Sequence, residues 1–451
     1  MGSKLVGADT GHIDSSVAVM ALRAQVVSKF IWGTSLLLLA AALFLLPAEL
    51  SNDAKSYLQY PKDSYLNFTT RTTKHGYITE EHTVTTEDGY LLTVFHLRSG
   101  KKHPGAVRRP PVVMMHGLLM SSDTWLDAGP DAALAYLLAD AYFDLWLGNV
   151  RGNYYGRRHT KLDPQKDSEF WDFSTDEMGL YDVPATIDYV LNKTGADQVN
   201  YIGFSQGAGA FLIMCSELPD HCGKARSLIA LAPATRLKYT KSLLVKLTVS
   251  QLKAYESALS AIGIKEVFSR GGFGQEILSF LCKYSIFTNV VCEKVIAIVD
   301  SDHAGSIKPK TLRALYGHFP AGTSVRTMAR YGQALLSEGY RKYDHGETNN
   351  MKVYGTPTAP FHNLSAVRVP TYILHGNNDR LVDPADVRWL ADRLPHVLER
   401  AEIDDPMWNH LDFMYSQHIR KLVLPKVLQY LAKYNEVDLA KQSERTMENL
   451  Q

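Results

Sequence analysis

The chain has 451 residues, of which 45% are hydrophobic and 21% are charged, proportions close to those of an ordinary globular protein. Its 48 lysines and arginines nearly balance its 47 aspartates and glutamates, so no overall charge favours nucleic acid or an anionic membrane as a partner. Four cysteines are too few for a disulfide scaffold, so a packed hydrophobic core must hold the fold together.

Residues 1–48 are expected to be a signal peptide or a signal anchor. Phe30–Leu46 is an uncharged apolar run of 17 residues that follows Arg23 and Lys29. This length is short for a membrane span, while the 29 residues before the run are long for a signal peptide and favour an anchor. A chain that began at Met20 would instead carry an ordinary cleavable signal, cut after Ala48. A buried core helix is disfavoured because the run has no polar face.

Glycosylation sequons are consistent with entry into the secretory pathway. Three Asn-x-Ser/Thr patterns begin at Asn67, Asn192 and Asn363. Each pattern is short and weak by itself, but all three follow the signal-like run. We therefore expect at least one of them to carry a glycan.

The same oxidising compartment allows cysteines to pair. Cys282 and Cys292 are separated by nine residues and would close a small loop. Cys215 lies in an apolar, helix-like stretch, so a buried free thiol and a second bridge to Cys222 both remain open.

After a lead-in over residues 49–75, extended and helical patterns alternate. A β-rich hairpin is predicted over residues 82–97, with its turn at residues 87–89. Short apolar runs without alternation then predict strands buried on both faces, separated by helices of which 176–191 and 206–218 are examples. The predicted strands are 111–115, 143–147, 199–203, 228–231 and 370–374. This order predicts an α/β fold with a mainly parallel sheet flanked by helices.

One interval interrupts this pattern. Residues 235–367 contain helix-like stretches but no buried-strand pattern, which predicts a helical cap or lid inserted between two core parts, 76–234 and 368–435. The glycines at 271, 272 and 274 do not complete a nucleotide-binding motif, so a turn or a flexible lid is expected there. Residues 436–451 form a polar tail.

The strongest chemical signal is Gly203-Phe204-Ser205-Gln206-Gly207, between a predicted strand and a predicted helix. A nucleophile elbow needs such a tight turn, with glycines two residues before and after the serine. The helix N-terminus also favours developing negative charge. Ser205 is therefore the predicted nucleophile.

A serine nucleophile needs a base and an acid that orients the base. Asp379 follows the strand at 370–374 and is the predicted acid, whereas Asp383 begins a helix and is expected to cap it. His410 follows the next extended stretch and is the predicted base. His375 lies too close to the acid loop and is expected to be a hydrogen-bonded structural histidine.

The oxyanion requires fixed amide donors. The amide of Gln206, directly after the nucleophile, is one expected donor. The amide of Leu118, in the His116-Gly117-Leu118-Leu119 loop after the strand at 111–115, is the other. His116 is expected to brace this loop.

Many motifs between about Gly76 and Lys433 resemble the acid lipases, the family that includes gastric and lysosomal acid lipases and insect relatives. The motifs in order are residues 80–90, 116–119, 148–153, 169–174, 176–178, 181–185, 231–233, 320–324 and 409–413. The resemblance implies that Ser205, Asp379 and His410 form the catalytic triad, that Leu118 and Gln206 supply the oxyanion amides, and that Cys282 and Cys292 form the cap disulfide. The chain departs from the family at Phe204, where a histidine is usual. Packing under the elbow and substrate or pH preference are expected to respond to that change.

The leading hypothesis is a serine ester hydrolase, a lipase, that acts on neutral lipids such as triacylglycerols or sterol esters at a lipid-droplet or micelle surface. Alternatives are a lipid-binding or carrier protein that lost the chemistry, and a secreted serine peptidase. No cofactor, catalytic metal, nucleic acid or obligate protein partner is expected. The protein would be secreted or lysosomal, or anchored to a membrane through Phe30–Leu46.

Apolar residues of the predicted cap have two possible roles. They would either line the acyl-chain site or merely pack the cap on the core; examples are Ile277, Leu278, Phe280 and Leu281.

Overall fold

A computed structural model describes residues 49–101, 110–243, 245–246, 256, 259, 263–285 and 291–433. The apolar run Phe30–Leu46 and the polar tail at 436–451 lie outside these residues. Within them, no helix is both long enough and apolar enough to cross a membrane.

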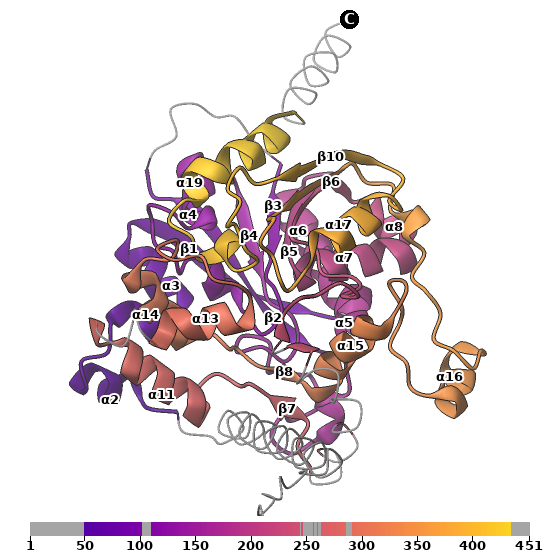
Figure 1. Cartoon of the computed structure of the whole chain (residues 1–451), viewed down its shortest axis with the longest axis horizontal. Coiled ribbons are helices and arrows are strands. Elements are labelled where there is room, and N and C mark those ends of the chain that lie inside the picture. The colour runs from indigo at the N-terminus through magenta and orange to yellow at the C-terminus, as the bar shows by residue number, and fades with distance from the viewer. Residues whose placement is uncertain are drawn as a thin grey trace, which may run out of the picture.

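An eight-stranded sheet forms the centre of the molecule, in the order β1-β2-β4-β3-β5-β6-β9-β10 (Figure 1). The pairs β1–β2 and β2–β4 are antiparallel, and all the remaining pairs of this sheet are parallel. The sequence predictions of a hairpin followed by a mainly parallel sheet are therefore confirmed. The strands are β1 (Tyr77–Thr85), β2 (Leu91–Ser99), β3 (Val112–Met115), β4 (Leu145–Gly148), β5 (Val199–Phe204), β6 (Ala225–Leu231), β9 (Thr371–His375) and β10 (Val397–Glu402).

The central strands are buried on both faces, as their continuous apolar runs predict. Along β3, Val112 and Met114 join one hydrophobic cluster, while Val113 and Met115 join another. The first cluster includes residues of helices α4 (Leu134–Asp140) and α19 (Ile419–Leu422). The second includes residues of α6 (Val183–Thr194), α7 (Gln206–Glu217) and α17 (Pro384–Ala391). Helices therefore cover both faces of the sheet (Figure 1).

The helices of the two core parts and of the lead-in follow the predicted order. The interval predicted as helix over 176–191 contains α5, a π-helical turn at Met178–Asp182 and α6, so its start is less regular than expected. The helices are α2 (Asn52–Tyr57), α3 (Phe68–Lys74), α4 (Leu134–Asp140), α5 (Thr175–Glu177), α6 (Val183–Thr194), α7 (Gln206–Glu217), α8 (Pro219–Cys222), α17 (Pro384–Ala391), α18 (Asp412–Tyr415) and α19 (Ile419–Leu422).

The interval between β6 and β9 is mostly helical where it is described. It also contains one small antiparallel pair, β7 with β8, which the sequence pattern did not predict because each strand has only two residues. Gly271 has a positive φ of 82° directly before α11, as expected for a turn. The elements are β7 (Glu266–Val267), α11 (Phe273–Cys282), α13 (Glu293–Val299), α14 (Pro309–His318), β8 (Thr323–Ser324), α15 (Val325–Leu336) and α16 (Glu347–Tyr354).

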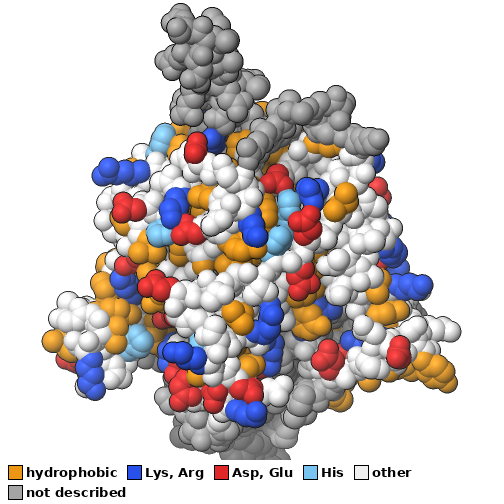
Figure 2. All heavy atoms as spheres, turned by 180° about the vertical axis from the view of Figure 1, so that it is seen from behind, with side chains coloured by type: hydrophobic (Ala, Val, Ile, Leu, Met, Phe, Trp, Pro, Cys, Tyr) orange, Lys and Arg blue, Asp and Glu red, His pale blue; other side chains and the backbone are white. Residues whose placement is uncertain are grey.

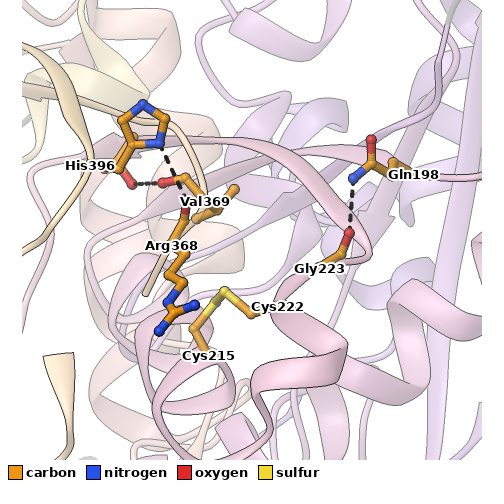
Figure 3. The surroundings of a disulfide bond; sticks show 8 residues. Gln198, Cys215, Cys222, Gly223, Arg368, Val369 and His396 are labelled. Atoms are coloured by element: carbon orange, nitrogen blue, oxygen red, sulfur yellow. Dashed lines mark hydrogen bonds between the residues drawn. A yellow bond between two sulfur atoms is a disulfide. The ribbon is translucent and has the colours of Figure 1, made fainter. Parts of the chain in front are cut away.

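All four cysteines are paired. Cys282, at the end of α11, is bonded to Cys292, directly before α13, as expected. Cys215 on α7 is bonded to Cys222 at the end of α8 (Figure 3). Of the two alternatives left open by the sequence, the structure therefore shows the second disulfide and not a free thiol. This pairing depends on the turn between α7 and α8, which brings the two α-carbons to 4.5 Å.

The surface carries both signs of charge. Figure 2 shows acidic and basic side chains interspersed over one face of the molecule. This mixture fits the near balance of charges in the composition.

A buried group of charges joins the lead-in, the core and the interval before β9. Arg71 on α3 contacts Asp127 at 2.8 Å and Asp123 at 3.4 Å. Arg270 contacts Asp123 at 3.0 Å, and His318 on α14 contacts Asp127 at 2.9 Å. Because burial penalises an unpaired charge strongly, removing one member of this group should destabilise the contact between these three parts.

Replacement of Arg71 by alanine should therefore lower the free energy of unfolding by about 3–5 kcal/mol, because it leaves Asp127 buried without its guanidinium partner. Chemical denaturation followed by circular dichroism measures this change. Lys74→Ala on the same helix is the control, because Lys74 pairs with Asp63 at the surface and should lose about 1 kcal/mol or less. Equal losses in the two variants would contradict the structural role of Arg71.

Candidate active site

Ser205 lies at the turn between β5 and α7, as predicted. Its backbone has φ 50° and ψ −113°, a conformation that side-chain-bearing residues rarely adopt. The Ser205 amide donates a 2.8 Å hydrogen bond to the carbonyl of Leu231 on β6. The neighbouring strand therefore holds the strained turn in place.

The two flanking glycines are required by close backbone contacts. A β-carbon at Gly203 would lie 2.6 Å from the backbone of Ala208, and one at Gly207 would lie 2.4 Å from the carbonyl oxygen of Met115. Real β-carbons do not approach backbone atoms so closely. The second contact also shows that the start of α7 lies against the end of β3.

This approach brings the two predicted oxyanion segments together. Gln206 begins α7, and the loop with Leu118 leaves β3 at the point that Gly207 touches. Leu119 has a positive φ of 59°, and its carbonyl accepts a 2.8 Å hydrogen bond from the amide of Ala321. The hydrogen bond to Leu119 thus helps to hold the loop that carries the Leu118 amide.

His116 has bonds that suit a bracing role. Its Nδ1 donates to the carbonyl of Gly117 at 2.8 Å, while its Nε2 accepts from the side-chain amide of Asn153 at 3.0 Å. Burial lowers the pKa of His116 to about 4, so the ring is neutral. Both nitrogens are occupied by structural partners, which agrees with the expectation that His116 braces the loop.

His410 and Asp379 come together in the way the triad prediction requires. Nδ1 of His410 lies 2.7 Å from Oδ2 of Asp379. The other oxygen of Asp379 accepts hydrogen bonds from the amides of Leu381 at 2.9 Å and Val382 at 2.7 Å. The carboxylate is therefore held in one orientation and leaves Nε2 of His410 available as a base.

Asp383 has the capping role expected from the sequence. Its side chain accepts a 2.8 Å hydrogen bond from the amide of Ala385 and caps α17. It also pairs with Lys241 at 2.7 Å. His375, at the end of β9, is buried, and burial lowers its pKa.

Phe204 connects the nucleophile and the base. It precedes Ser205 directly, and the centre of its ring lies 4.9 Å from that of His410. A β-carbon at Gly117 would lie 2.9 Å from the same phenyl ring. The departure from the family's histidine thus falls at a position that packs against both the base and the oxyanion loop.

Asp300 is a residue of the site that sequence reasoning missed. Its Oδ2 accepts hydrogen bonds from the amides of His410 at 2.7 Å and Leu411 at 3.2 Å, and its Oδ1 accepts from the amide of Arg380 at 3.0 Å. One carboxyl group therefore joins the acid loop to the base loop. No local motif marks it, because Asp300 lies in the interval between β6 and β9.

The charges of the site act on one another. Burial and the nearby carboxylate of Asp379 raise the pKa of Asp300 well above its ordinary range. Burial alone would lower the pKa of His410, but the negative charges of Asp379 and Asp300 outweigh it and raise that pKa. The base thus becomes neutral, and able to accept a proton, only at a higher pH than an isolated imidazole.

Known proteins are similar to this chain over most of its length. Residues 68–129 match a partial α/β-hydrolase lipase region, and residues 110–254 match the α/β-hydrolase fold. The chain is 37% identical to Lipase 1 of Drosophila melanogaster over 83% of this chain and 82% of that protein. It is also 37% identical to gastric triacylglycerol lipase of Homo sapiens, over 78% and 87% of the two chains. The chain belongs to this lipase family.

Membership of the lipase family confirms the resemblance drawn from the motifs and makes the chain a carboxylic ester hydrolase. A solved structure of a putative lipase from Sulfolobus solfataricus is only 12% identical but matches the fold with a TM-score of 0.52, over 80% of this chain and 95% of that one. That match supports the α/β-hydrolase fold alone.

If the triad works as a unit, Ser205→Ala and His410→Ala should each lower kcat on a soluble ester by on the order of 10⁵–10⁶-fold, and the double variant should be little worse. Asp379→Asn should lower kcat by about 10⁴-fold. Asp383→Asn is the control and should retain most of the activity. The acid assignment is wrong if Asp383→Asn inactivates the enzyme while Asp379→Asn does not.

Asp300→Asn should move the acid limb of the kcat/KM profile to lower pH. The substitution removes a negative charge that raises the pKa of His410, so the base becomes neutral at a lower pH. Asp302→Asn is a matched control, because Asp302 lies two residues away and pairs with Lys294 at the surface. A lower melting temperature with an unchanged acid limb would mean that Asp300 is only structural.

Proposed function

We propose that this chain hydrolyses carboxylic esters of neutral lipids, such as triacylglycerols or sterol esters, through an acyl-enzyme on Ser205. The observation that carries the proposal is the strained turn at Ser205 beside a histidine that is oriented by a 2.7 Å bond to Asp379. Lipase relatives of similar length support it.

The chemistry follows from these groups. His410 takes the proton of the Ser205 hydroxyl as the oxygen attacks the ester carbonyl, and the amides of Leu118 and Gln206 stabilise the oxyanion. His410 then gives the proton to the departing alcohol. Water, activated by the same histidine, attacks the acyl-enzyme and releases the fatty acid.

Helix α11 supports action at a lipid surface. Its exposed side chains include Phe273, Ile277 and Phe280, which are 36–40% exposed. Its buried side chains include the polar residues Glu276 and Ser279, so the usual arrangement of an amphipathic helix is reversed. Such an exposed apolar stripe suits contact with lipid.

The apolar residues of α11 that were expected to line the acyl-chain site lie in two different surroundings. Leu278 is partly buried and packs against the hydrophobic core, whereas Ile277 and Phe280 face outward. We propose that residues 235–367 act as a cap in which Leu278 and Leu281 help to cover the site while the outward residues meet the lipid. The disulfide between Cys282 and Cys292 fixes the end of this helix.

The two disulfides and the lipase relatives indicate a protein of the secretory pathway. We propose that it is secreted or lysosomal, with Phe30–Leu46 as either a cleaved signal or an anchor. The predicted sequon residues Asn67, Asn192 and Asn363 are all exposed, which supports glycosylation at one or more of them. A neutral lipid surface is the proposed partner, without nucleic acid or an obligate protein.

A substrate panel with the purified protein separates this function from its alternatives. A lipase should cleave long-chain triacylglycerol or sterol ester and should react with a serine-directed phosphonate at Ser205. A lipid carrier would bind lipid without reacting. A peptidase would react with the phosphonate but would cleave peptides and leave the lipids intact.

The surface role of α11 gives a sharper expectation. The double variant Ile277→Ser with Phe280→Ser should lower hydrolysis of an emulsified long-chain triacylglycerol by about tenfold or more, because each buried apolar side chain contributes about 1.5–3 kcal/mol to contact with lipid. Hydrolysis of a short soluble ester should stay unchanged.

The control for this experiment is Met351→Ser on α16, an exposed apolar residue at the opposite side of the molecule in Figure 1. It should alter neither activity. Equal losses of activity on both substrates in the α11 variant would indicate general destabilisation. A similar loss of triacylglycerol hydrolysis in the Met351 variant would show that α11 has no special role at the lipid surface.

A further inference from the structure

Two histidines and a glutamate gather on the first hairpin, away from the catalytic residues. Glu80 and His82 alternate along β1 and so lie on the same face of the sheet, and His96 on β2 is the register partner of Glu80. One ligand atom from each residue lies within 4.8 Å of the others. In the sheet order, β4 and β3 separate these strands from β5 and Ser205.

The distances suit a small metal ion. Oε2 of Glu80 lies 3.6 Å from Nε2 of His82 and 3.5 Å from Nδ1 of His96. Ligands about 2.0–2.1 Å from a tetrahedral Zn²⁺ are about 3.4 Å apart, so Glu80 is already close to the required distance from each imidazole, and the two imidazole nitrogens lie within 4.8 Å of each other. Nε2 of His82 is buried and has no hydrogen-bond partner within the described structure.

Outer contacts orient both imidazoles. Nε2 of His96 lies 2.5 Å from Oδ1 of Asp144, and Nδ1 of His82 lies 3.1 Å from the hydroxyl of Tyr189 on α6. Metal-binding histidines commonly use their second nitrogen in this way. When His96 donates a proton to Asp144, its Nδ1 lone pair faces the Glu80 carboxylate, an unfavourable arrangement that a cation between them would relieve.

Packing and charge leave room for the ion. The His96 ring stacks on Trp146, with ring centres 4.1 Å apart, so its orientation is restricted. Arg98 binds Oε1 of Glu80 and leaves Oε2 for a metal. The carboxylates of Glu80 and Asp144 contact the imidazoles directly, whereas Arg98 and Lys193 supply the positive charges nearby.

We propose that Glu80, His82 and His96 form a binding site for a divalent transition-metal ion, with Zn²⁺ as the best fit and water as the fourth ligand. Two imidazoles and one carboxylate suit Zn²⁺ better than Mg²⁺ or Ca²⁺, which prefer oxygen ligands. The ion would join β1, the edge strand, to β2 and would stabilise the folded hairpin. It takes no part in ester hydrolysis.

The test uses the untagged full chain after treatment with a chelator. Titration calorimetry with ZnCl₂ should show one site, and Zn²⁺ should raise the melting temperature while the same concentration of Mg²⁺ does not. Co²⁺ in place of Zn²⁺ should give the strong visible absorption of a tetrahedral site.

Variants connect this binding to the cluster. His82→Gln and His96→Gln should each weaken Zn²⁺ binding at least tenfold and remove the thermal shift, and Asp144→Asn should weaken it about 10–100-fold. His396→Gln, an exposed histidine elsewhere, is the matched control and should bind as the unaltered chain does. Retained hydrolysis of a soluble ester shows that a variant is folded. If a histidine variant does not fold, Glu80→Gln is used in its place to test the site. Absence of Zn²⁺ binding by the unaltered chain, or equal binding by His82→Gln and His96→Gln, would overturn the proposal.

Discussion

Ser205 has a left-handed backbone conformation that a residue with a β-carbon keeps only when its surroundings hold it there. The parallel sheet supplies that restraint, because the Ser205 amide is bonded to β6 on one side and Gly207 touches the end of β3 on the other. The oxyanion loop, the nucleophile and the helix that follows it are therefore positioned by three neighbouring strands. Any change that separates these strands would disturb all of these groups together.

The acid and the base reach this turn from the far end of the chain, on loops that electrostatics holds in place. Asp379 binds the imidazole of His410, while Asp300 binds the backbone amides of both loops. Asp300 belongs to the interval between β6 and β9, so that interval contributes to holding the loops of Asp379 and His410. The buried charges around Arg71 and Asp127 tie the same interval to the core a second time.

These attachments leave α11 with an unusual orientation. Its polar side chains are held inside, where Glu276 pairs with Lys55 at 2.7 Å, and its apolar stripe faces outward. A helix that exposes apolar groups loses the stabilisation that burial would bring, and contact with an apolar surface would restore it. This orientation is the basis of the proposed contact with a lipid surface.

The sequence by itself predicted the α/β architecture and the turn at Ser205, and it selected the pair Asp379 and His410 that the structure brings together, because strand patterns, flanking glycines and chain order are local signals. It also separated Asp379 from the helix cap Asp383, since capping depends on the next few residues. Only the tertiary structure decided the pairing of Cys215 with Cys222, the role of Asp300, the outward stripe of α11 and the meeting of His82 with His96. Each of these depends on contacts between segments that are distant along the chain or on how an element is turned, and no pattern of neighbouring residues encodes that geometry.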